Sequence, residues 1–346
     1  MAQPTPVTPV KTEQLVTDVL ATIERERERE IVARRFGLFD RKETLEQIGE
    51  MLGITRERVR QLEKAVVTRL RSTAEQGGLP HITDFQARVL DLLQESGQVS
   101  RVSELTAKLS DTPNREEQAR VAFLSQLSPE LSVVQEDDNF YYSVGVKSVY
   151  DEKALKTRVA SLIETIKKIG EPQTIEQIAK TASIADSKQA AALASTSKHL
   201  ATLNGRWGLI KWPMVNPKNI RDKIYVILKE NGKHMHFNEI SAAIKDSDFK
   251  RKDVTTQAIH NELIKDKRFV LIGRGIYALK EWGYEKGTVA DIISEVLREA
   301  NEPLHRDEIV KRVLKSRFVK ETTILLNLQG KPQFKRVAKA TYALAE

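Results

Sequence analysis

Cysteine is absent from the sequence, which excludes disulfide bonds, thiol nucleophiles and zinc sites that use cysteine. No stretch approaches the ~18 consecutive apolar residues that a membrane span needs. Residues 1–10 alternate proline, threonine and valine and lack the apolar core of a signal peptide. We therefore expect a cytoplasmic protein with a disordered tail over residues 1–10.

Motifs for catalysis are also missing. There is no H-E-x-x-H, no phosphate-binding glycine loop and no G-x-S-x-G. The six histidines are scattered; His234 and His236 flank Met235, with no carboxylate at ligand spacing beside them. We predict no enzyme, no cofactor and no metal site.

Length and charge indicate the number of domains and the kind of binding partner. A chain of 346 residues is too long for one core, so several small domains are expected. Lysine and arginine number 56 against 48 acidic residues, giving a formal charge of +8 and a pI near 9.4. This surplus favours a polyanionic partner.

A pattern that recurs about every seventy residues sets the predicted architecture. In each of four copies an amphipathic helix ends near glycine or asparagine, two more helices follow, and alternating apolar residues around a turn close the copy. Three helices and a hairpin make a winged helix. The predicted helix ends are Gly97, Gly170, Gly232 and Asn301.

The first fifth of the chain lacks the hairpin and contains two helices joined by a tight turn. Thr44-Leu45-Glu46-Gln47 is a capping box that begins one helix, and Gly53 ends it. Thr55 caps a second helix, in which the apolar residues are spaced to face inward. These residues are Val59, Leu62, Val66 and Leu70.

The opposite face of this second helix is rich in polar and charged residues: Arg56, Glu57, Arg60, Gln61 and Lys64. In a helix-turn-helix the second helix enters the major groove, where arginine pairs with guanine, glutamine with adenine and glutamate with cytosine. A charged outer face is also what a merely solvated helix shows, and composition alone leaves both interpretations open.

Residues 27–38, 44–49 and 55–63 together resemble region four of the sigma-70 family of bacterial sigma factors. The resemblance covers about the first fifth of the chain and runs through both helices, the turn and the preceding helix. It implies recognition of the upstream, minus-thirty-five promoter element and docking on the flap of the RNA polymerase beta subunit. By position it implies base readers at Arg56, Glu57, Arg60 and Gln61, and backbone contacts at Arg35, Thr44, Arg58 and Lys64.

A complete sigma factor also has a region-two helix rich in aromatic and basic residues. Aromatic residues make up 6% of this chain, and the conspicuous ones belong to predicted hairpins or apolar helix faces. No stacking platform for unpaired bases is left. We do not expect this chain to melt promoters alone.

Residues 220–282 resemble the HARE-type winged helix, which is also found in the RNA polymerase delta subunit. The resemblance rests on residues 228–232, 236–240 and 268–279. Residues 288–344 resemble a more divergent copy, in which Ala338-Lys339-Ala340 replaces the Gly-Arg-Gly wing tip. Its third helix is largely apolar, which favours packing against a protein partner.

The charges of the predicted wings indicate which of the four copies contact DNA. Arg274 and Arg206 lie beside glycines at two wing tips, and Arg251 and Lys252 precede a third helix, so we predict DNA-backbone contacts there. Glu136-Asp137-Asp138 on the first wing would repel phosphate. We expect that copy to bind protein or to space its neighbours.

The sequence therefore predicts a mainly α protein of tandem helix-turn-helix and winged-helix modules with short β-hairpin wings. We expect a nucleoid-associated transcription factor that binds promoter-like double-stranded DNA and RNA polymerase. Two alternatives stay open: an adaptor that holds polymerase without reading bases, and a DNA-repair or restriction accessory protein. The expected modules after the tail are 11–76, 82–146, 151–213, 218–283 and 286–346.

Overall fold

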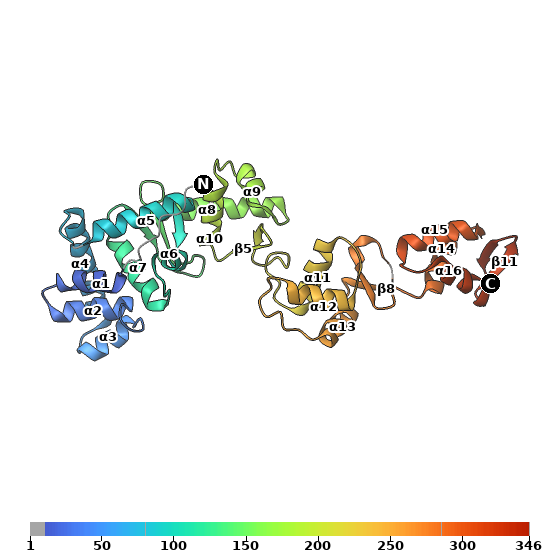
Figure 1. Ribbon diagram of the computed structural model, residues 1–346, viewed down its shortest axis with the longest axis horizontal. Coiled ribbons are helices and arrows are strands. Elements are labelled where there is room, and N and C mark those ends of the chain that lie inside the picture. The colour runs from blue at the N-terminus through green and yellow to red at the C-terminus, as the bar shows by residue number, and fades with distance from the viewer. Residues whose placement is uncertain (1–10, 80, 285, 346) are drawn as a thin grey trace. The chain divides into compact units, whose positions relative to one another are not determined.

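The computed structural model describes residues 11–79, 81–284 and 286–345, and the predicted tail lies outside these ranges. The described chain is mainly helical and carries four small antiparallel sheets of three strands (Figure 1). This confirms the mainly α class. The chain divides into two compact units, residues 1–211 and 212–346.

The first unit begins with four helices, which we call the head. They are α1 (Thr12–Ala21), α2 (Glu26–Phe36), α3 (Leu45–Leu52) and α4 (Arg56–Glu75). Ile31, Ile48 and Val59 form a fully buried cluster where α2, α3 and α4 meet. The two helices predicted around Gly53 are α3 and α4.

Two segments with one element order complete the first unit: helix, short strand, two helices and a hairpin. Residues 82–146 contain α5 (Ile82–Ser96), β1 (Val99–Arg101), α6 (Val102–Leu109), α7 (Arg115–Leu127), β2 (Leu131–Val134) and β3 (Ser143–Val146). Residues 152–209 contain α8 (Glu152–Ile169), β4 (Gln173–Thr174), α9 (Ile175–Thr181), α10 (Ser187–Thr196), β5 (Leu200–Leu203) and β6 (Arg206–Leu209).

The second unit repeats this order twice. Residues 220–282 contain α11 (Ile220–Asn231), β7 (Met235–His236), α12 (Phe237–Asp246), α13 (Thr256–Lys265), β8 (Phe269–Gly273), β9 (Ile276–Leu279) and the short η1 (Lys280–Trp282). Residues 289–344 contain α14 (Val289–Ala300), β10 (Leu304–His305), α15 (Arg306–Ser316), α16 (Glu321–Gly330), β11 (Phe334–Ala338) and β12 (Thr341–Leu344).

All four repeats share one sheet topology and one way of ending the first helix. In every sheet the last strand lies between the other two. The four predicted helix ends are confirmed, because each of these residues is the C-cap of its helix in the left-handed conformation.

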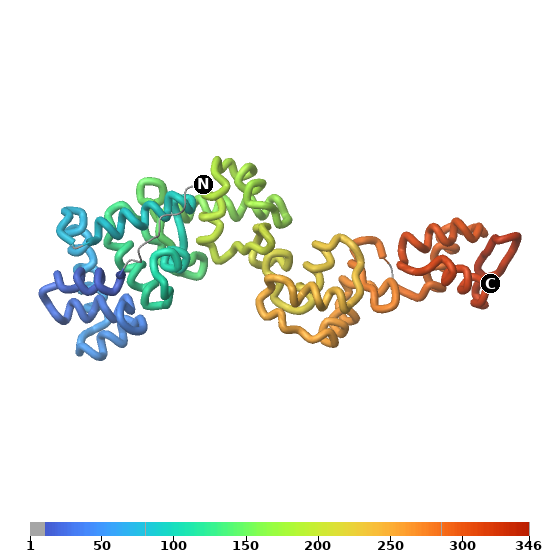
Figure 2. Tube along the Cα trace, in the orientation of Figure 1, coloured from blue at the N-terminus to red at the C-terminus, as the bar shows by residue number. Residues whose placement is uncertain are grey.

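The head and residues 82–146 share one hydrophobic core. The core includes Val16 of α1, Leu70 of α4 and Phe123 of α7. In Figure 2 the head is blue and residues 82–146 run from cyan to green. Helix α4 ends at Glu75 and α5 begins at Ile82, and side chains of both helices lie in this one core.

A buried arginine lies at this junction. The side chain of Arg120 on α7 is 6% exposed; its Nε donates to the carbonyl of Leu38 at 2.8 Å, and its guanidinium pairs with Glu117 at 2.6 Å and Glu13 at 3.0 Å. Thr12 also donates to Glu117, at 2.5 Å. Since an unpaired buried charge is costly, this network fixes the head against α7.

The acidic turn of residues 82–146 contacts the next segment of the same chain. Glu136 pairs with Lys198 at 2.7 Å, and Asp137 lies 3.6 Å from Lys156. The backbone N–H of Tyr141 donates to the carbonyl of Thr196 at 2.9 Å. Glu136 and Asp137 of the wing that we expected to repel phosphate thus pair with lysines of the next segment.

We predict that Arg120→Ala lowers the free energy of unfolding of the first unit by about 3–5 kcal/mol, because Glu117 loses its buried partner. Urea unfolding followed by circular dichroism measures this. Arg115→Ala, on the exposed start of the same helix, is the control and should change stability by no more than about 0.5 kcal/mol. Equal effects of the two substitutions would contradict the role of Arg120.

Candidate nucleic-acid interface

The turn between α3 and α4 is defined by two caps and a close backbone approach. The Thr44 side chain accepts the N–H of Gln47, whose side chain in turn accepts the N–H of Thr44. Thr55 accepts the N–H of Arg58. A Cβ on Gly49 would lie 2.6 Å from the carbonyl oxygen of Ile54, so this turn requires glycine there.

Helix α2 braces the turn and α4. Arg27 donates to the carbonyl of Leu52 at 2.6 Å, at the end of α3. Glu28 is buried and pairs with Arg69 of α4 at 2.8 Å. The hydrogen bond from Arg69 is the main cause that lowers the pKa of Glu28. The structure thus gives Arg27 and Arg69 positioning roles that the helical periodicity did not reveal.

The face of α4 opposite this brace is exposed over Arg56, Glu57, Arg60, Gln61 and Lys64, as predicted. Val59, Val66 and Leu70 are buried on the inner face, and Leu62 is partly buried. The predicted base-reading residues therefore lie together on one surface of one helix.

These outer side chains interact with one another. Arg60 donates two hydrogen bonds to the Glu57 carboxylate, at 2.7 and 2.9 Å, and Gln61 lies 3.4 Å from it. The hydrogen bond from Arg60 lowers the pKa of Glu57. Exposed ion pairs of this kind are weak, so a base edge can replace the contact.

The predicted backbone contacts in the head fall in different environments. Arg58 and Thr44 are exposed, Arg58 on the first turn of α4 and Thr44 at the start of α3. Arg35 is partly buried, and its Nε donates to Glu63 of α4 at 3.2 Å. Arg35 thus braces α2 against α4 in this structure, and its guanidinium would leave Glu63 in order to meet a phosphate.

The other predicted backbone contacts lie outside the head. Arg206 is exposed at the start of β6, and Arg274 is exposed in the turn between β8 and β9. Arg251 and Lys252 are exposed in the loop between α12 and α13. Arg206 belongs to the first unit and the other three to the second.

A cleft of about 900 Å³ lies between the head and residues 82–146. Its lining mixes cations such as Arg41, Lys42 and Arg115 with acids such as Glu63 and Glu136. Burial, followed by the charge of Arg35, lowers the pKa of Lys42. This mixture of signs does not match a uniform polyanion.

Within residues 11–79, 81–284 and 286–345, no three His, Asp or Glu side chains gather as a metal ion would require. His234 instead packs on Phe318, with ring centroids 4.3 Å apart, and His236 packs on Phe237. No helix in the described part of the chain has the length and apolar character to cross a membrane.

We predict that Gly49→Ala destabilises the head by more than about 1 kcal/mol, since its methyl group would collide with the Ile54 carbonyl and separate α3 from α4. Gly53→Asn is the matched control, because Gly53 has a φ of +65°, nothing lies within 4 Å of its added Cβ, and asparagine tolerates this conformation. The measurement is urea unfolding; a Gly49→Ala protein as stable as wild type would disprove the close approach.

Glu28 predicts a pH-dependent contribution to stability. Because its folded pKa lies below its unfolded value of ~4.3, the ionised carboxylate stabilises the fold above that value, and the contribution is lost as pH falls through the folded pKa. The stability difference between wild type and Glu28→Gln should be largest near pH 7 and shrink below pH ~4. A difference that stays constant from pH 7 to pH 3 would refute this.

Comparison with known proteins finds a family match within the head. Residues 25–72 match sigma-70 region 4, which confirms the predicted region. The chain is 51% identical over 49 residues to RNA polymerase sigma factor RpoD of Helicobacter pylori, which covers 14% of this chain and 7% of that protein. It is 50% identical over 55 residues to sigma factor SigA of a Bacillus species, covering 16% of this chain and 14% of SigA. The similarity thus spans less than a sixth of these relatives, and the family match lies within the head.

Proposed function

We propose that this protein is a sigma-factor-like transcription factor that reads a minus-thirty-five-type promoter element through the outer face of α4 and associates with bacterial RNA polymerase. The observation that carries the proposal is the exposed, clustered set of Arg56, Glu57, Arg60 and Gln61 on a helix whose other face is buried. Such a surface presents several base-specific donors and acceptors together.

The match to sigma-70 region 4 supports both the DNA and the polymerase parts of this proposal. In that family the region docks on the flap of the polymerase beta subunit, and we propose the same partner here. Because the family match covers residues 25–72 and the sequence leaves no stacking platform for unpaired bases, we propose a regulator of initiation that does not melt promoter DNA by itself. A cytoplasmic, nucleoid-associated location follows from this role.

We also propose that the four repeated segments are winged helices, the last two of the HARE type. Their order of helix, strand, two helices and hairpin, with the last strand central in each sheet, supports this. Arg206, Arg251, Lys252 and Arg274 then contact DNA backbone from their hairpins and loops. For residues 286–346 we propose a protein partner, because Leu326 on α16 is 68% exposed and Val337 on β11 is 48% exposed.

An adaptor that holds polymerase without reading bases is the second candidate. Phe39 and Met51 of the head are 44% and 43% exposed, and apolar side chains of this kind suit a protein contact. Retention of polymerase in high salt, with no footprint on any duplex, would favour the adaptor.

We predict that Arg60→Ala lowers the preference for the selected promoter element over random duplex by about 5- to 150-fold, the range of one lost bidentate base contact. Arg71→Ala removes the same charge from the last turns of α4 and is the matched control; it should leave the preference unchanged. Competition binding at fixed salt measures both. Unchanged preference in the Arg60→Ala protein would count against base reading by α4.

A further inference from the structure

Helix α13 is held rigidly within residues 220–282. Thr255 caps it by accepting the N–H of Ala258 at 3.2 Å, and the hydroxyl of Thr256 lies 3.0 Å from that of Ser241 on α12. Ile259 and Leu263 are buried on its inner face. Both its beginning and its packing are therefore fixed before any ligand binds.

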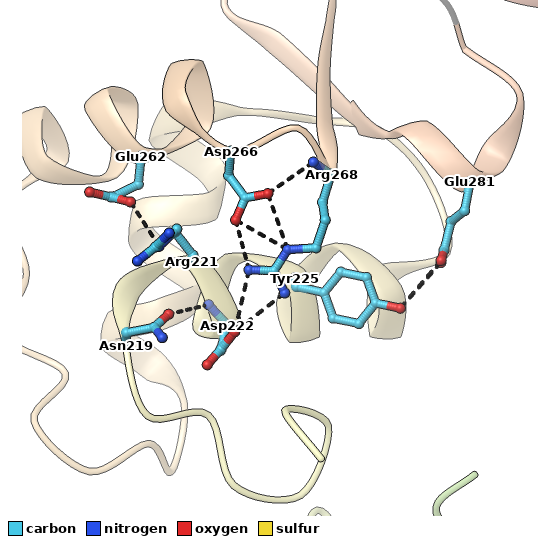
Figure 3. A network of polar contacts seen from close by, with 8 residues as sticks. All are labelled: Asn219, Arg221, Asp222, Tyr225, Glu262, Asp266, Arg268 and Glu281. Atoms are coloured by element: carbon cyan, nitrogen blue, oxygen red, sulfur yellow. Dashed lines mark hydrogen bonds and ion pairs between the residues drawn. The ribbon is translucent and has the colours of Figure 1, made fainter. Parts of the chain in front are cut away.

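A polar network fixes the other end of α13 (Figure 3). Glu262 pairs with Arg221 of α11 at 3.2 Å. The Arg268 guanidinium lies between two carboxylates, 2.8 Å from Asp266 and 3.3 Å from Asp222 (Figure 3). Since a charge-paired guanidinium has a defined geometry, this network sets the angle of α13 on α11.

The outer face of this rigid helix presents two amides. Gln257 and Asn261 are exposed and one turn apart, and Gln257 donates to Asn261 at 3.1 Å. Glutamine and asparagine side chains on a third helix suit the donor and acceptor pair that adenine shows in the major groove. Helical periodicity did not single out these residues, because a polar outer face is typical of solvated helices.

The loop before α13 contains two energetically unfavourable features, a buried lysine beneath it and a positive φ within it. Lys223 of α11 is 5% exposed and donates to the carbonyls of Lys250 and Arg251, at 2.9 and 2.7 Å. Arg251 has a φ of +55°, which arginine rarely adopts. Lys250, Arg251 and Lys252 are all exposed above this buried ammonium.

The positive φ of Arg251 and the burial of the Lys223 ammonium near other cations both disfavour folding of this loop. Burial and the charge of Arg251 lower the pKa of Lys223. A phosphate bound to the exposed Arg251 side chain would offset the repulsion between Arg251 and Lys223. The hairpin that follows α13 adds another exposed cation, Arg274, at its turn, so cations flank the amide-bearing helix on both sides in the sequence.

We propose that residues 220–282 form a second DNA-reading surface, in which Gln257 and Asn261 contact an adenine-containing step of duplex DNA while Arg251 and Arg274 contact its phosphates. This deepens the proposed function, because it makes the chain a reader of two separate sequence elements rather than one.

The test is selection of binding sites from a random duplex library by the full-length chain. We expect wild type to select two elements. A Gln257→Ala/Asn261→Ala double variant should lose the adenine-containing element, with at least about a tenfold loss of affinity for it, and should keep the element that α4 reads. Arg60→Ala should lose the element that α4 reads and keep the adenine-containing element. Lys280→Ala, in η1 beside the Glu281 that contacts α11, removes one positive charge, as Arg60→Ala does, and is the control. It should select both elements.

A second variant separates phosphate contact from base reading. Arg251→Asn removes the charge while asparagine tolerates the positive φ, so the fold of the loop is retained. We expect Arg251→Asn to bind all sequences more weakly by the same factor. The slope of log affinity against log salt concentration should be smaller in magnitude by about one.

The outcomes distinguish this proposal from the role of the head. One element that depends on Gln257 and Asn261 but not on Arg60 would support the second surface and overturn base reading by α4. One element that depends on Arg60 and is selected equally by the double variant would overturn the second surface alone. An unchanged salt slope in Arg251→Asn would remove the phosphate contact at that loop.

Discussion

The contact between Gly49 and the Ile54 carbonyl is the constraint on which the DNA-facing surface depends. It brings α3 and α4 closer than any side chain at position 49 permits, and it lets Ile48 and Val59 join Ile31 in one buried cluster. With the inner face of α4 buried, Arg56, Arg60 and Gln61 face outward together. The orientation of the proposed reading surface is therefore set by backbone packing on the opposite side of the helix.

The head is also packed against the next segment of the chain. Its core continues into α7, where Arg120 pairs with acids from α1 and α7. The acidic turn of residues 82–146 then binds Lys156 and Lys198 of the following segment. The first unit consequently holds α4 on a continuous packed core. Two acids of the wing that we expected to repel phosphate pair with lysines of the same chain.

Local signals in the sequence predicted the local structure well. Capping residues, glycine helix ends and apolar periodicity located α3, α4 and the first helix of each repeat, because these features depend on neighbours in the chain. Long-range contacts were not predictable in this way. Neither the Arg120 network nor the pairing of Glu136 with Lys198 follows from spacing, since each joins residues that only the fold brings together. The buried Lys223 beneath a basic loop is a similar case, because spacing does not identify the carbonyls to which it donates.

Positioning residues and reading residues are separate in both proposed surfaces. In the head, Arg27 and Arg69 hold helices while Arg56 and Arg60 remain exposed. In the second unit, Arg221 and Arg268 hold α13 while Gln257 and Asn261 remain exposed. This division explains why a net charge of +8 says little by itself about where nucleic acid binds.

The absence of native cysteine permits the most direct measurement of the central claim, that the outer face of α4 lies against base edges. A single Gln61→Cys substitution in the full chain can carry an iron chelate that cleaves DNA close to it. The account predicts cuts confined to a few neighbouring base pairs within the selected promoter element. Uncut DNA, or cuts spread evenly along the duplex, would contradict it.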